Sequence, residues 1–427
     1  MKLISSRDRA FKSMVKRVTS RCSAPRGSVE NAVKAILKGV ERGRDAAIAR
    51  YTKKFDRIRL KPAQFRISPE QVKEAYYQIR KEEGDALRYA AQRIRAFHER
   101  QRTKTWMYQD DGATLGQVVM PLDAVGLYVP GGKAVYPSTV LMNAIPAKVA
   151  GVKRVVMCTP TPKGGISPYL LVAADIAGVD EVYRIGGVQA IAAMAYGTDT
   201  IARVDKIIGP GNLYVAAAKR LVYGTVGIDM IAGPSELLVI ADASANPAHV
   251  AADFLCEAEH DEEARVYLVT TSERVAKEVI THVRGLLAGA TREKIAATAV
   301  ARHGVAFVVD SMDDAIVLAN DIAPEHLTLA VDRPFDYLEK VRHAGALFLG
   351  RYTPPAVADY VAGPNHVLPT GGAARFCSAL SFDDFVKKSN IIAYSKEGLS
   401  KVKDHVARIA HMEGLTAHAK SIESRLP

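Results

Sequence analysis

Short apolar runs that alternate with Ala-rich helical stretches constrain the fold of this chain most strongly. From about residue 115, such runs occupy positions 124–129, 154–158, 206–209, 236–242, 265–271, 305–310 and 346–350. Between most of them lie stretches with helical spacing, at 137–150, 167–177, 187–196 and 212–223. Strands that alternate with helices favour parallel sheets, so an α/β fold is predicted. Because the pattern runs twice, before and after residue 235, we expect two Rossmann-like lobes.

Four regions follow from this pattern. Residues 1–105 are predicted to be a helical N-terminal region, because apolar residues recur there three and four positions apart. Within it, Ser68 and Pro69 resemble a helix N-cap and the first helical residue. Residues 106–235 are expected to form the first Rossmann-like lobe and residues 236–376 the second. The strand pattern largely stops after residue 376, so residues 377–427 are predicted to be a helical tail.

The bulk composition favours a soluble globular protein. The chain has 427 residues, and no apolar run in it reaches the roughly 18 residues that a bilayer span needs. The basic N-terminus lacks an apolar signal core, which favours a cytoplasmic location and no membrane partner. Four cysteines, Cys22, Cys158, Cys256 and Cys377, form no C-x-x-C pair. We therefore expect any metal to be held by His and carboxylate side chains.

The net charge of +12 admits two interpretations. A basic surface can bind nucleic acid, or it can attract anionic cofactors without any nucleic-acid partner. Many of the basic residues lie in the first 105 positions, at helical spacing, and the chain has one Trp and no recognisable RNA- or DNA-binding motif. We therefore predict no nucleic-acid partner, and the basic N-terminal region has no functional interpretation.

Three glycine turns follow predicted strands, at 128–132, 186–189 and 209–212. Glycine lets the backbone approach a ligand closely, and the N-terminus of a helix attracts phosphate. None of the turns matches the G-x-G-x-x-G fingerprint, so each by itself also fits an ordinary connection from strand to helix. Two such turns in consecutive units strengthen the prediction of a bound dinucleotide.

Four further segments carry groups suited to metal binding or proton transfer, at 256–263, 323–327, 359–372 and 413–418. His260 lies within an acidic run, and Glu325 is adjacent to His326, a pair that suits water activation and proton transfer. Residues 359–372 form a loop dense in Gly, Pro, Asn and His, which is costly to order without a purpose. Each segment alone also fits a solvated or packed helix end, and Glu413 and His418 alone fit surface positions.

Taken together, these segments resemble the blocks of the histidinol dehydrogenase family. The matching blocks are YVPGG (128–132), GGVQAIAAMAYGT (186–198), GPGN (209–212), AGPSE (232–236), EAEHD (257–261), APEHL (323–327), DYVAGPNHVLPTGG (359–372) and EGLTAH (413–418). The resemblance covers nearly the whole chain, and eight blocks at compatible spacing are very specific. It implies an intertwined homodimer in which the C-terminal tail reaches the partner subunit.

The resemblance also implies a role for each matching residue. The residues expected to contact NAD are Tyr128, Gln189 and Asn212. Those expected to hold Zn2+ are Glu257, His260, Asp359 and His418. The substrate is expected to contact Ser235, Glu257, His260, His326, Asp359, His366, Glu413 and His418. Glu325 and His326 are the expected catalytic acid–base pair.

The implied reaction is the oxidation of L-histidinol, through L-histidinaldehyde, to L-histidine, with two NAD. It forms the last steps of histidine biosynthesis. In it, His326 would take up the alcohol proton and Glu325 would activate water to hydrate the aldehyde. Relatives of the family oxidise other small alcohols, such as sulfonated diols, and this is the alternative function. Those relatives lack the YVPGG block, so the resemblance favours histidinol.

Two positions depart from the family pattern. Glu257 stands where the family has a Gln zinc ligand, and Pro355 stands where many members have a substrate-facing Glu. One carboxylate has thus been lost and another gained nearby. We hypothesise that Glu257 partly replaces the missing charge that faces the ammonium group of the substrate.

Overall fold

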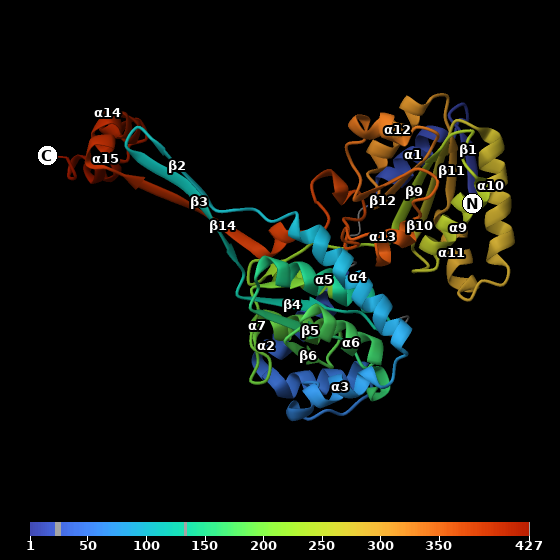
Figure 1. Cartoon of the computed structure of the whole chain (residues 1–427), viewed down its shortest axis with the longest axis horizontal. Helices are drawn as coiled ribbons and strands as arrows, with labels where there is room; N and C mark the ends of the chain where they lie inside the picture. Colours follow the sequence, from blue (N-terminus) through green and yellow to red (C-terminus); the bar gives the residue numbers. More distant parts are fainter. Residues whose placement is uncertain (22–26, 132–134, 427) are drawn as a thin grey trace.

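Two parallel sheets lie at the centres of two lobes, and a long arm projects from the region where the lobes meet (Figure 1). The computed structural model describes residues 1–21, 27–131 and 135–426. Cys22 and Gly132 of the sequence predictions lie outside the described residues. The two parallel sheets confirm the predicted α/β fold with two Rossmann-like lobes.

The first lobe contains a five-stranded parallel sheet in the order β6-β5-β4-β7-β8. Counted along the chain, this is the Rossmann order 3-2-1-4-5. The strands are β4 (Ala124–Tyr128), β5 (Arg154–Cys158), β6 (Glu181–Tyr183), β7 (Lys206–Ile208) and β8 (Gly227–Ile228). The connecting helices are α5 (Pro137–Ala150), α6 (Pro168–Ala177), α7 (Gly187–Tyr196) and α8 (Leu213–Val222), with a 3-10 turn at Pro162–Gly164.

Three N-terminal helices pack on the outside of the helices that flank this sheet. They are α2 (Gly27–Phe55), α3 (Pro69–Tyr76) and α4 (Lys81–Glu99), with a 3-10 turn at Pro62–Gln64. Helix α2 packs on α7 and α8, whereas α4 packs on α5. The predicted cap of α3 is confirmed, because the Ser68 hydroxyl accepts a hydrogen bond from the Gln71 backbone N–H at 3.3 Å.

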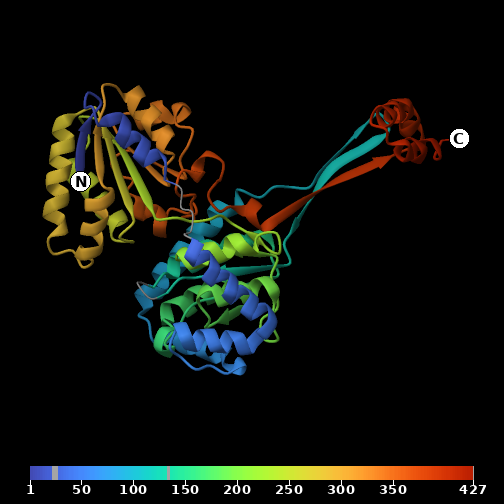
Figure 2. The same cartoon turned by 180° about the vertical axis from the view of Figure 1, so that it is seen from behind.

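The second lobe contains a six-stranded parallel sheet in the order β1-β11-β10-β9-β12-β13. The strands are β1 (Lys2–Ser5), β9 (Glu236–Ala241), β10 (Arg265–Thr270), β11 (Val305–Val308), β12 (His326–Ala330) and β13 (Ala346–Leu349). The helices are α1 (Phe11–Thr19), α9 (Pro247–Ala258), α10 (Glu273–Leu287), α11 (Glu293–His303), α12 (Met312–Ile322) and α13 (Pro355–Tyr360). Figure 2 shows β1 and α1, in dark blue, beside elements from the second half of the chain. Shorter 3-10 turns occupy Pro334–Lys340, Ala373–Arg375 and Phe382–Phe385.

The arm is a three-stranded antiparallel sheet that ends in two helices. Its strands pair in the order β14-β3-β2 and comprise β2 (Trp106–Asp110), β3 (Ala113–Pro121) and β14 (Val386–Tyr394). Helices α14 (Lys396–Met412) and α15 (Thr416–Glu423) pack against each other at the far end of the arm, away from both lobes (Figure 1).

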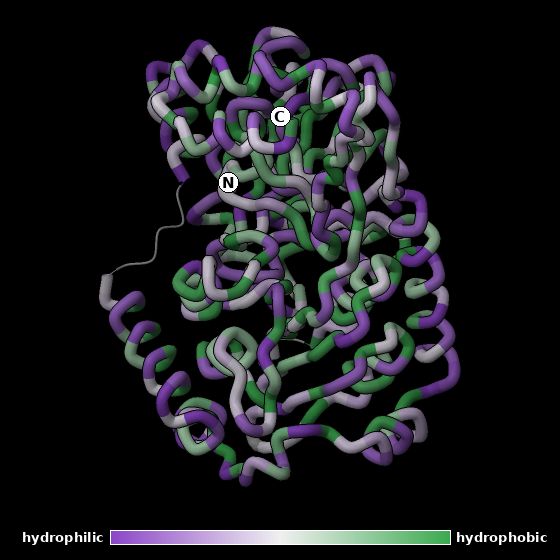
Figure 3. Tube along the Cα trace, turned by 90° about the vertical axis from the view of Figure 1, so that its left-hand side faces the viewer, coloured by the Kyte–Doolittle hydropathy of each residue, from purple (hydrophilic) through white to green (hydrophobic). Residues whose placement is uncertain are grey.

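Both sheets are buried on both faces, which explains why their strands are almost continuously apolar. Along β9, Leu237 and Val239 pack toward α9 and α10, while Leu238 and Ile240 pack toward α1 and α12. Figure 3 shows hydrophobic segments running through the interior of each lobe. Strands buried in this way hold the residues at their ends in fixed positions.

The structure departs from the sequence prediction in three places. The N-terminal region, predicted to be helical, begins with strand β1, and the tail predicted to be helical after residue 376 first contributes the nine-residue strand β14. Strands β2 and β3, at 106–121, belong to the arm and not to the first parallel sheet. Strand β2 is exposed along its whole length and β14 along most of it, so neither has the apolar pattern of a buried strand.

Candidate functional site

Glu325 and His326 lie where two adjacent buried strands begin. Helix α12 ends at Ala323, which has a left-handed backbone with φ 49° and ψ 64°, and Pro324 prevents the helix from continuing. The chain then enters β12, which pairs with β9 so that His326 lies opposite Leu237. This turn brings Glu325 and His326 beside Glu236, the first residue of β9.

The backbone of Glu236 contacts both side chains. Its N–H donates to Glu325 Oε2 at 2.9 Å, and its carbonyl oxygen lies 3.1 Å from His326 Nδ1. Because a carbonyl oxygen only accepts hydrogen bonds, this contact assigns the proton to Nδ1 of His326. The lone pair on Nε2 then remains available to accept a proton.

Glu257, near the end of α9, completes a buried cluster with this pair. Its Oε2 lies 3.4 Å from His326 Nδ1, and its Oε1 is buried without a hydrogen-bond partner. Ligand atoms of Glu257, Glu325 and His326 lie within 4.8 Å of one another. Oxygen and imidazole nitrogen atoms suit Zn2+, and an unpartnered buried carboxylate oxygen leaves an acceptor for a cation.

Burial shifts the pKa values of all three groups toward their neutral forms. It raises the pKa of Glu257 to about 7, and the charge on Asp359 adds to this shift while His260 and Ser235 oppose it. Burial, followed by the charge on Glu257, raises the pKa of Glu325 well above its ordinary value. Burial also lowers the pKa of His326. A cation bound here would favour the charged form of both carboxyl groups.

The loop at 361–372 brings His366 to the cluster and connects the two lobes. His366 Nδ1 lies 3.0 Å from the Asp359 carbonyl oxygen, and its Nε2 lies 3.5 Å from the hydroxyl oxygen of Thr139 on α5 of the first lobe. The Asn365 side chain donates to the carbonyl oxygen of Met142 on the same helix at 2.5 Å. Burial lowers the pKa of His366, and Asp359 opposes this shift through its charge and its hydrogen-bonding carbonyl oxygen.

Two of the predicted site residues lie far from this cluster within the chain. Glu413 directly follows α14 and His418 lies on α15, both exposed at the end of the arm (Figure 1). The structure therefore brings Glu257, Glu325, His326 and His366 together and separates them from Glu413 and His418. Ser235, His260 and Asp359 lie close enough to Glu257 to change its pKa.

The predicted dinucleotide residues gather at the carboxyl edge of the first sheet, where Rossmann folds bind nucleotides. The Tyr128 hydroxyl, at the end of β4, accepts a hydrogen bond from the Gly187 N–H at 3.0 Å. Both polar atoms of the Gln189 side chain are buried without a partner. The Asn212 side chain caps α8 by accepting from the backbone N–H groups of residues 214 and 215. Unpartnered donors and acceptors of this kind fit a polar ligand.

The turn at Gly209 packs directly on Tyr128. Gly209 has a φ of +105°, and a Cβ atom there would lie 2.2 Å from the Tyr128 carbonyl oxygen. The geometry thus requires glycine at this position. It holds the 209–212 turn against the end of β4, the first strand of the lobe.

The model of one protein family, described as histidinol dehydrogenase, matches residues 19–426. The chain belongs to the histidinol dehydrogenase family. It is 50% identical over 427 residues to the histidinol dehydrogenase of Syntrophotalea carbinolica, covering 100% of this chain and 99% of the relative. It is 51% identical over 399 residues to that of Bacillus cereus, covering 93% and 92% of the two chains. The crystal structure of histidinol dehydrogenase from Elizabethkingia anophelis superimposes with a TM-score of 0.95 at 37% identity, covering 100% and 98%.

Membership of the histidinol dehydrogenase family confirms the predicted enzyme class, an NAD-dependent oxidoreductase of histidine biosynthesis. The alternative substrate class, a sulfonated diol, has no support from these relatives. Among the described residues, no helix has the length and apolar character needed to cross a bilayer. The roles of individual site residues, the bound zinc and the homodimer stay predictions.

Sequence analysis of this histidinol dehydrogenase family member overlooked several buried polar groups. Thr159 and Thr161 follow β5 at the carboxyl edge of the first sheet, and their buried hydroxyl oxygens have no partner. The signal available was the segment Thr159-Pro160-Thr161 directly after a predicted strand. Glu236 was also missed, although it ends the AGPSE block, because no local pattern shows what its backbone contacts.

Proposed function

We propose that this chain oxidises L-histidinol through L-histidinaldehyde to L-histidine, reducing two NAD. The observation that carries the proposal is the buried cluster of Glu257, Glu325 and His326 beside the loop that joins the lobes. Two adjacent buried carboxyl groups, one of them with an oxygen that has no hydrogen-bond partner, favour a cationic ligand. The amine and imidazole of histidinol are such groups.

His326 is the proposed base for the alcohol proton. Its Nδ1 proton faces the Glu236 carbonyl oxygen, which leaves Nε2 as the acceptor. A neutral imidazole suits this role, and burial keeps His326 neutral by lowering its pKa. Each of the two oxidation steps passes a hydride to NAD, which is the chemistry that this cofactor supplies when bound.

Glu325 is the proposed base for the second half of the reaction. The aldehyde must add water before it can lose a second hydride, and a carboxylate can accept the proton of that water. The Glu236 N–H holds Glu325 Oε2 at 2.9 Å, so the carboxylate is oriented before substrate arrives. Ser235, directly before Glu236, and His366 are proposed to contact the substrate.

The proposed zinc ligands are Glu257, His260 and Asp359 of one subunit and His418 of the partner subunit. Their oxygen and nitrogen donors fit the metal, and Glu257 Oε1 is buried and free of other partners. When bound, zinc would supply a positive charge that grips and orients the imidazole and amine of the substrate. His260 and Asp359 lie close enough to Glu257 to shift its pKa, so the three proposed ligands from one subunit lie near one another.

The proposed NAD site lies at the carboxyl edge of the first sheet. Tyr128, Gln189 and Asn212 line the turns that end β4 and begin α7 and α8. The two N-termini of these helices would stabilise the negative charge of the pyrophosphate.

The proposed assembly is a homodimer, with each arm reaching the partner subunit. The arm exposes large apolar side chains, including Trp106, Met107, Ile392 and Met412. Apolar surface of this extent is usually covered by another chain. The dimer would bring Glu413 and His418 from the exposed end of one arm to the site of the other subunit.

We also propose that the enzyme is cytoplasmic, in keeping with its biosynthetic class and its free cysteines Cys158, Cys256 and Cys377.

The test is to supply zinc-loaded protein with L-histidinol and count the NADH formed for each substrate consumed. Two NADH and L-histidine as the product are expected. One NADH with accumulated aldehyde would contradict the second step, and no turnover with bound zinc and NAD would contradict the substrate. A sample treated with a chelator, assayed alongside, measures the contribution of the metal.

A further inference from the structure

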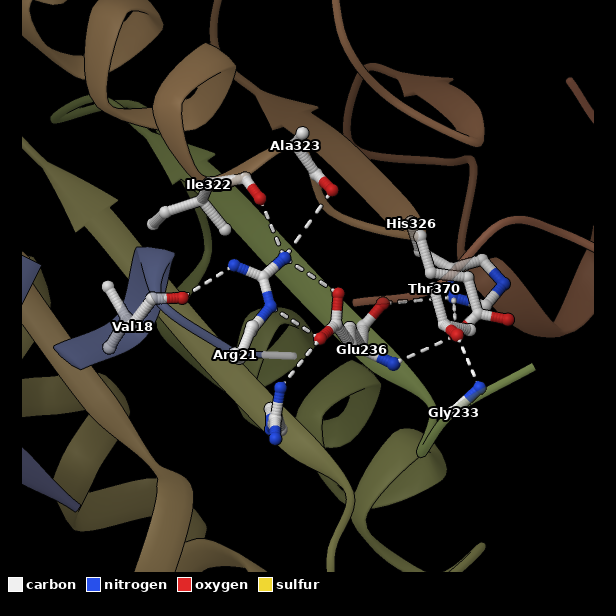
Figure 4. Close-up of polar contacts among 10 residues, drawn as sticks. Val18, Arg21, Gly233, Glu236, Ile322, Ala323, His326 and Thr370 are labelled. Atoms are coloured by element: carbon white, nitrogen blue, oxygen red, sulfur yellow. Dashed lines mark hydrogen bonds and ion pairs between the residues drawn. The ribbon is translucent and has the colours of Figure 1, made fainter. Parts of the chain in front are cut away.

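A buried ion pair lies directly behind the proposed catalytic residues. The Glu236 side chain is fully buried and accepts from Arg21 through both oxygens, at 2.6 Å from Nε and 2.8 Å from an Nη atom. Arg265 donates to the same carboxylate at 3.1 Å. Two guanidinium groups thus contact one carboxylate in the interior of the second lobe, and Figure 4 shows the Arg21 group beside Glu236.

Arg21 also fixes two neighbouring elements through its remaining N–H groups. It donates to the Val18 carbonyl oxygen of α1 at 2.6 Å and to the Ile322 carbonyl oxygen at the end of α12 at 2.7 Å. Figure 4 shows these contacts converging on one guanidinium group. Since Ile322 precedes Glu325 by three residues, Arg21 holds both the start of β9 and the turn that leads into β12.

The backbone of Glu236 connects this ion pair to the proposed catalytic residues. Its N–H binds the Glu325 carboxylate and its carbonyl oxygen binds His326 Nδ1, so one residue orients both proposed bases. We propose that the Arg21–Glu236 pair is a positioning device that holds the backbone of Glu236 for this purpose. The proposal rests on the proposed roles of Glu325 and His326.

Stability alone does not account for a charged pair at this position. A buried ion pair loses so much hydration energy that apolar side chains of similar size are often equally stabilising. A bidentate Arg–carboxylate contact does, however, fix direction as well as distance. The two proposed bases, which lie where two adjacent strands begin, must be oriented accurately. A displacement of about 1 Å can reduce the rate about 100-fold.

The experiment compares Glu236→Gln, Arg21→Met and Arg21→Lys with the unmodified chain, using zinc-loaded protein and L-histidinol. Glu236→Gln keeps the shape of the side chain and removes its charge. We expect kcat to fall about 10- to 100-fold while KM for histidinol and the zinc content change less than about threefold. Arg21→Lys should retain more kcat than Arg21→Met, because lysine keeps the positive charge. It should not restore kcat fully, because it lacks the planar fork of the guanidinium group.

The matched control is Arg7→Met. Arg7 lies in the same N-terminal segment and pairs with Asp310 on the same lobe, but its side chain is 83% exposed. Its loss should leave kcat unchanged. A folded Glu236→Gln enzyme with the kcat of the unmodified chain, or one that changes only KM, overturns the proposal.

A second variant covers the case in which a single change leaves an unpaired buried charge and prevents folding. Arg21→Met combined with Glu236→Gln removes both charges of the pair, and its kcat is expected to fall in the same way. Normal kcat in this folded double variant overturns the positioning role.

Parallel assays of Glu325→Gln and His326→Asn separate this inference from the proposed function. If both turn over histidinol like the unmodified chain, the assigned catalytic roles fail and the positioning proposal fails with them. If both are impaired while Glu236→Gln is fully active, only the positioning proposal fails. Absence of turnover in the unmodified chain contradicts the function itself.

Discussion

At the scale of single residues, Glu257 shows how one substitution changes the charge of a site. The resemblance to the family implies an amide at this position, and the carboxylate found here is buried, with one oxygen lacking a hydrogen-bond partner and the other 3.4 Å from His326 Nδ1. Pro355, at the start of α13, is buried and carries no charge. Glu257 lies on α9 and Pro355 on α13, and these two helices contact each other.

The first prediction is that Glu257→Gln weakens binding of histidinol more than it weakens zinc retention. The amide keeps an oxygen donor for the metal but removes the charge that attracts the ammonium group of the substrate. KM for histidinol and zinc content after dialysis measure the two effects. The exposed neighbour Glu259, changed to Gln, is the control and should leave both unchanged. Equal loss of zinc and substrate binding would contradict the hypothesis.

A second prediction concerns Asp56, which follows α2 in the first lobe. One of its carboxylate oxygens is buried without a partner, and burial raises its pKa to about 6 from an ordinary value of 3.8. The folded chain therefore keeps a proton that the unfolded chain loses, and this contribution to stability disappears as pH rises from about 4 through about 6.

Asp56→Asn should accordingly raise Tm at pH 8 and bring little change below pH 4. Thermal unfolding followed by circular dichroism across this range provides the measurement. Asp310→Asn is the contrasting variant, because the Arg7 hydrogen bond lowers the pKa of Asp310 and its loss should bring no gain at pH 8. A Tm difference for Asp56→Asn that does not vary with pH would refute the assignment.

At the scale of elements, most of the buried strands of the two parallel sheets were predicted from the sequence, whereas the exposed strands of the arm were overlooked. Strand β9 reads as ELLVIA, all buried, whereas β2 is exposed throughout and has no apolar face to detect. Strand β12 was missed because it begins with His326, which also fits a packed residue at a helix end. The proximity of Glu325 to His326 was predictable because they are adjacent, but the contact of Arg21 with Glu236 joins residues 215 positions apart.

The turn after β7 provides a prediction at this scale. Gly209→Ala would place a methyl group 2.2 Å from the Tyr128 carbonyl oxygen, a backbone atom that cannot rotate away. The turn must shift, and with it Asn212, so NAD affinity should fall about tenfold or more, equivalent to about 1.4 kcal/mol. Calorimetric titration with NAD measures this change.

Gly224→Ala is a closely matched control. Gly224 also has a positive φ, +99°, but a Cβ atom there would meet nothing within 4 Å. It lies between α8 and β8, at the opposite edge of the sheet from the strand ends of the proposed NAD site. It should cost about 1–3 kcal/mol of stability through backbone strain and leave NAD affinity unchanged. Equal affinities for the two variants would argue against the proposed NAD site.

At the scale of the whole molecule, the arm separates Glu413 and His418 from the lobes that would use them. We expect two inactive variants to complement each other. His326→Ala inactivates the site in its own lobe, whereas His418→Ala removes a ligand from the site of the partner subunit. In a mixed dimer, one of the two sites then contains only unmodified residues.

Co-expression of these two variants should restore about a quarter of the unmodified activity, because about half of the dimers are mixed and each has one intact site. Each variant expressed alone should be nearly inactive. No recovery in isolated mixed dimers would indicate that the tail acts within its own subunit. Size-exclusion chromatography with light scattering verifies the dimer in each preparation.

Strand β1 and Arg21 also have a consequence for the synthesis of the protein. Residues 2–5 pair with β11, about 300 residues further along the chain, so they leave the ribosome long before their partner exists. At roughly 5–20 residues per second, they wait for about 15–60 seconds. Glu236 and Ile322, which Arg21 contacts, are likewise made late. The second lobe is therefore completed by a segment made long before its partners, and the proposed catalytic residues Glu325 and His326 can be positioned only after residue 326 has been synthesised.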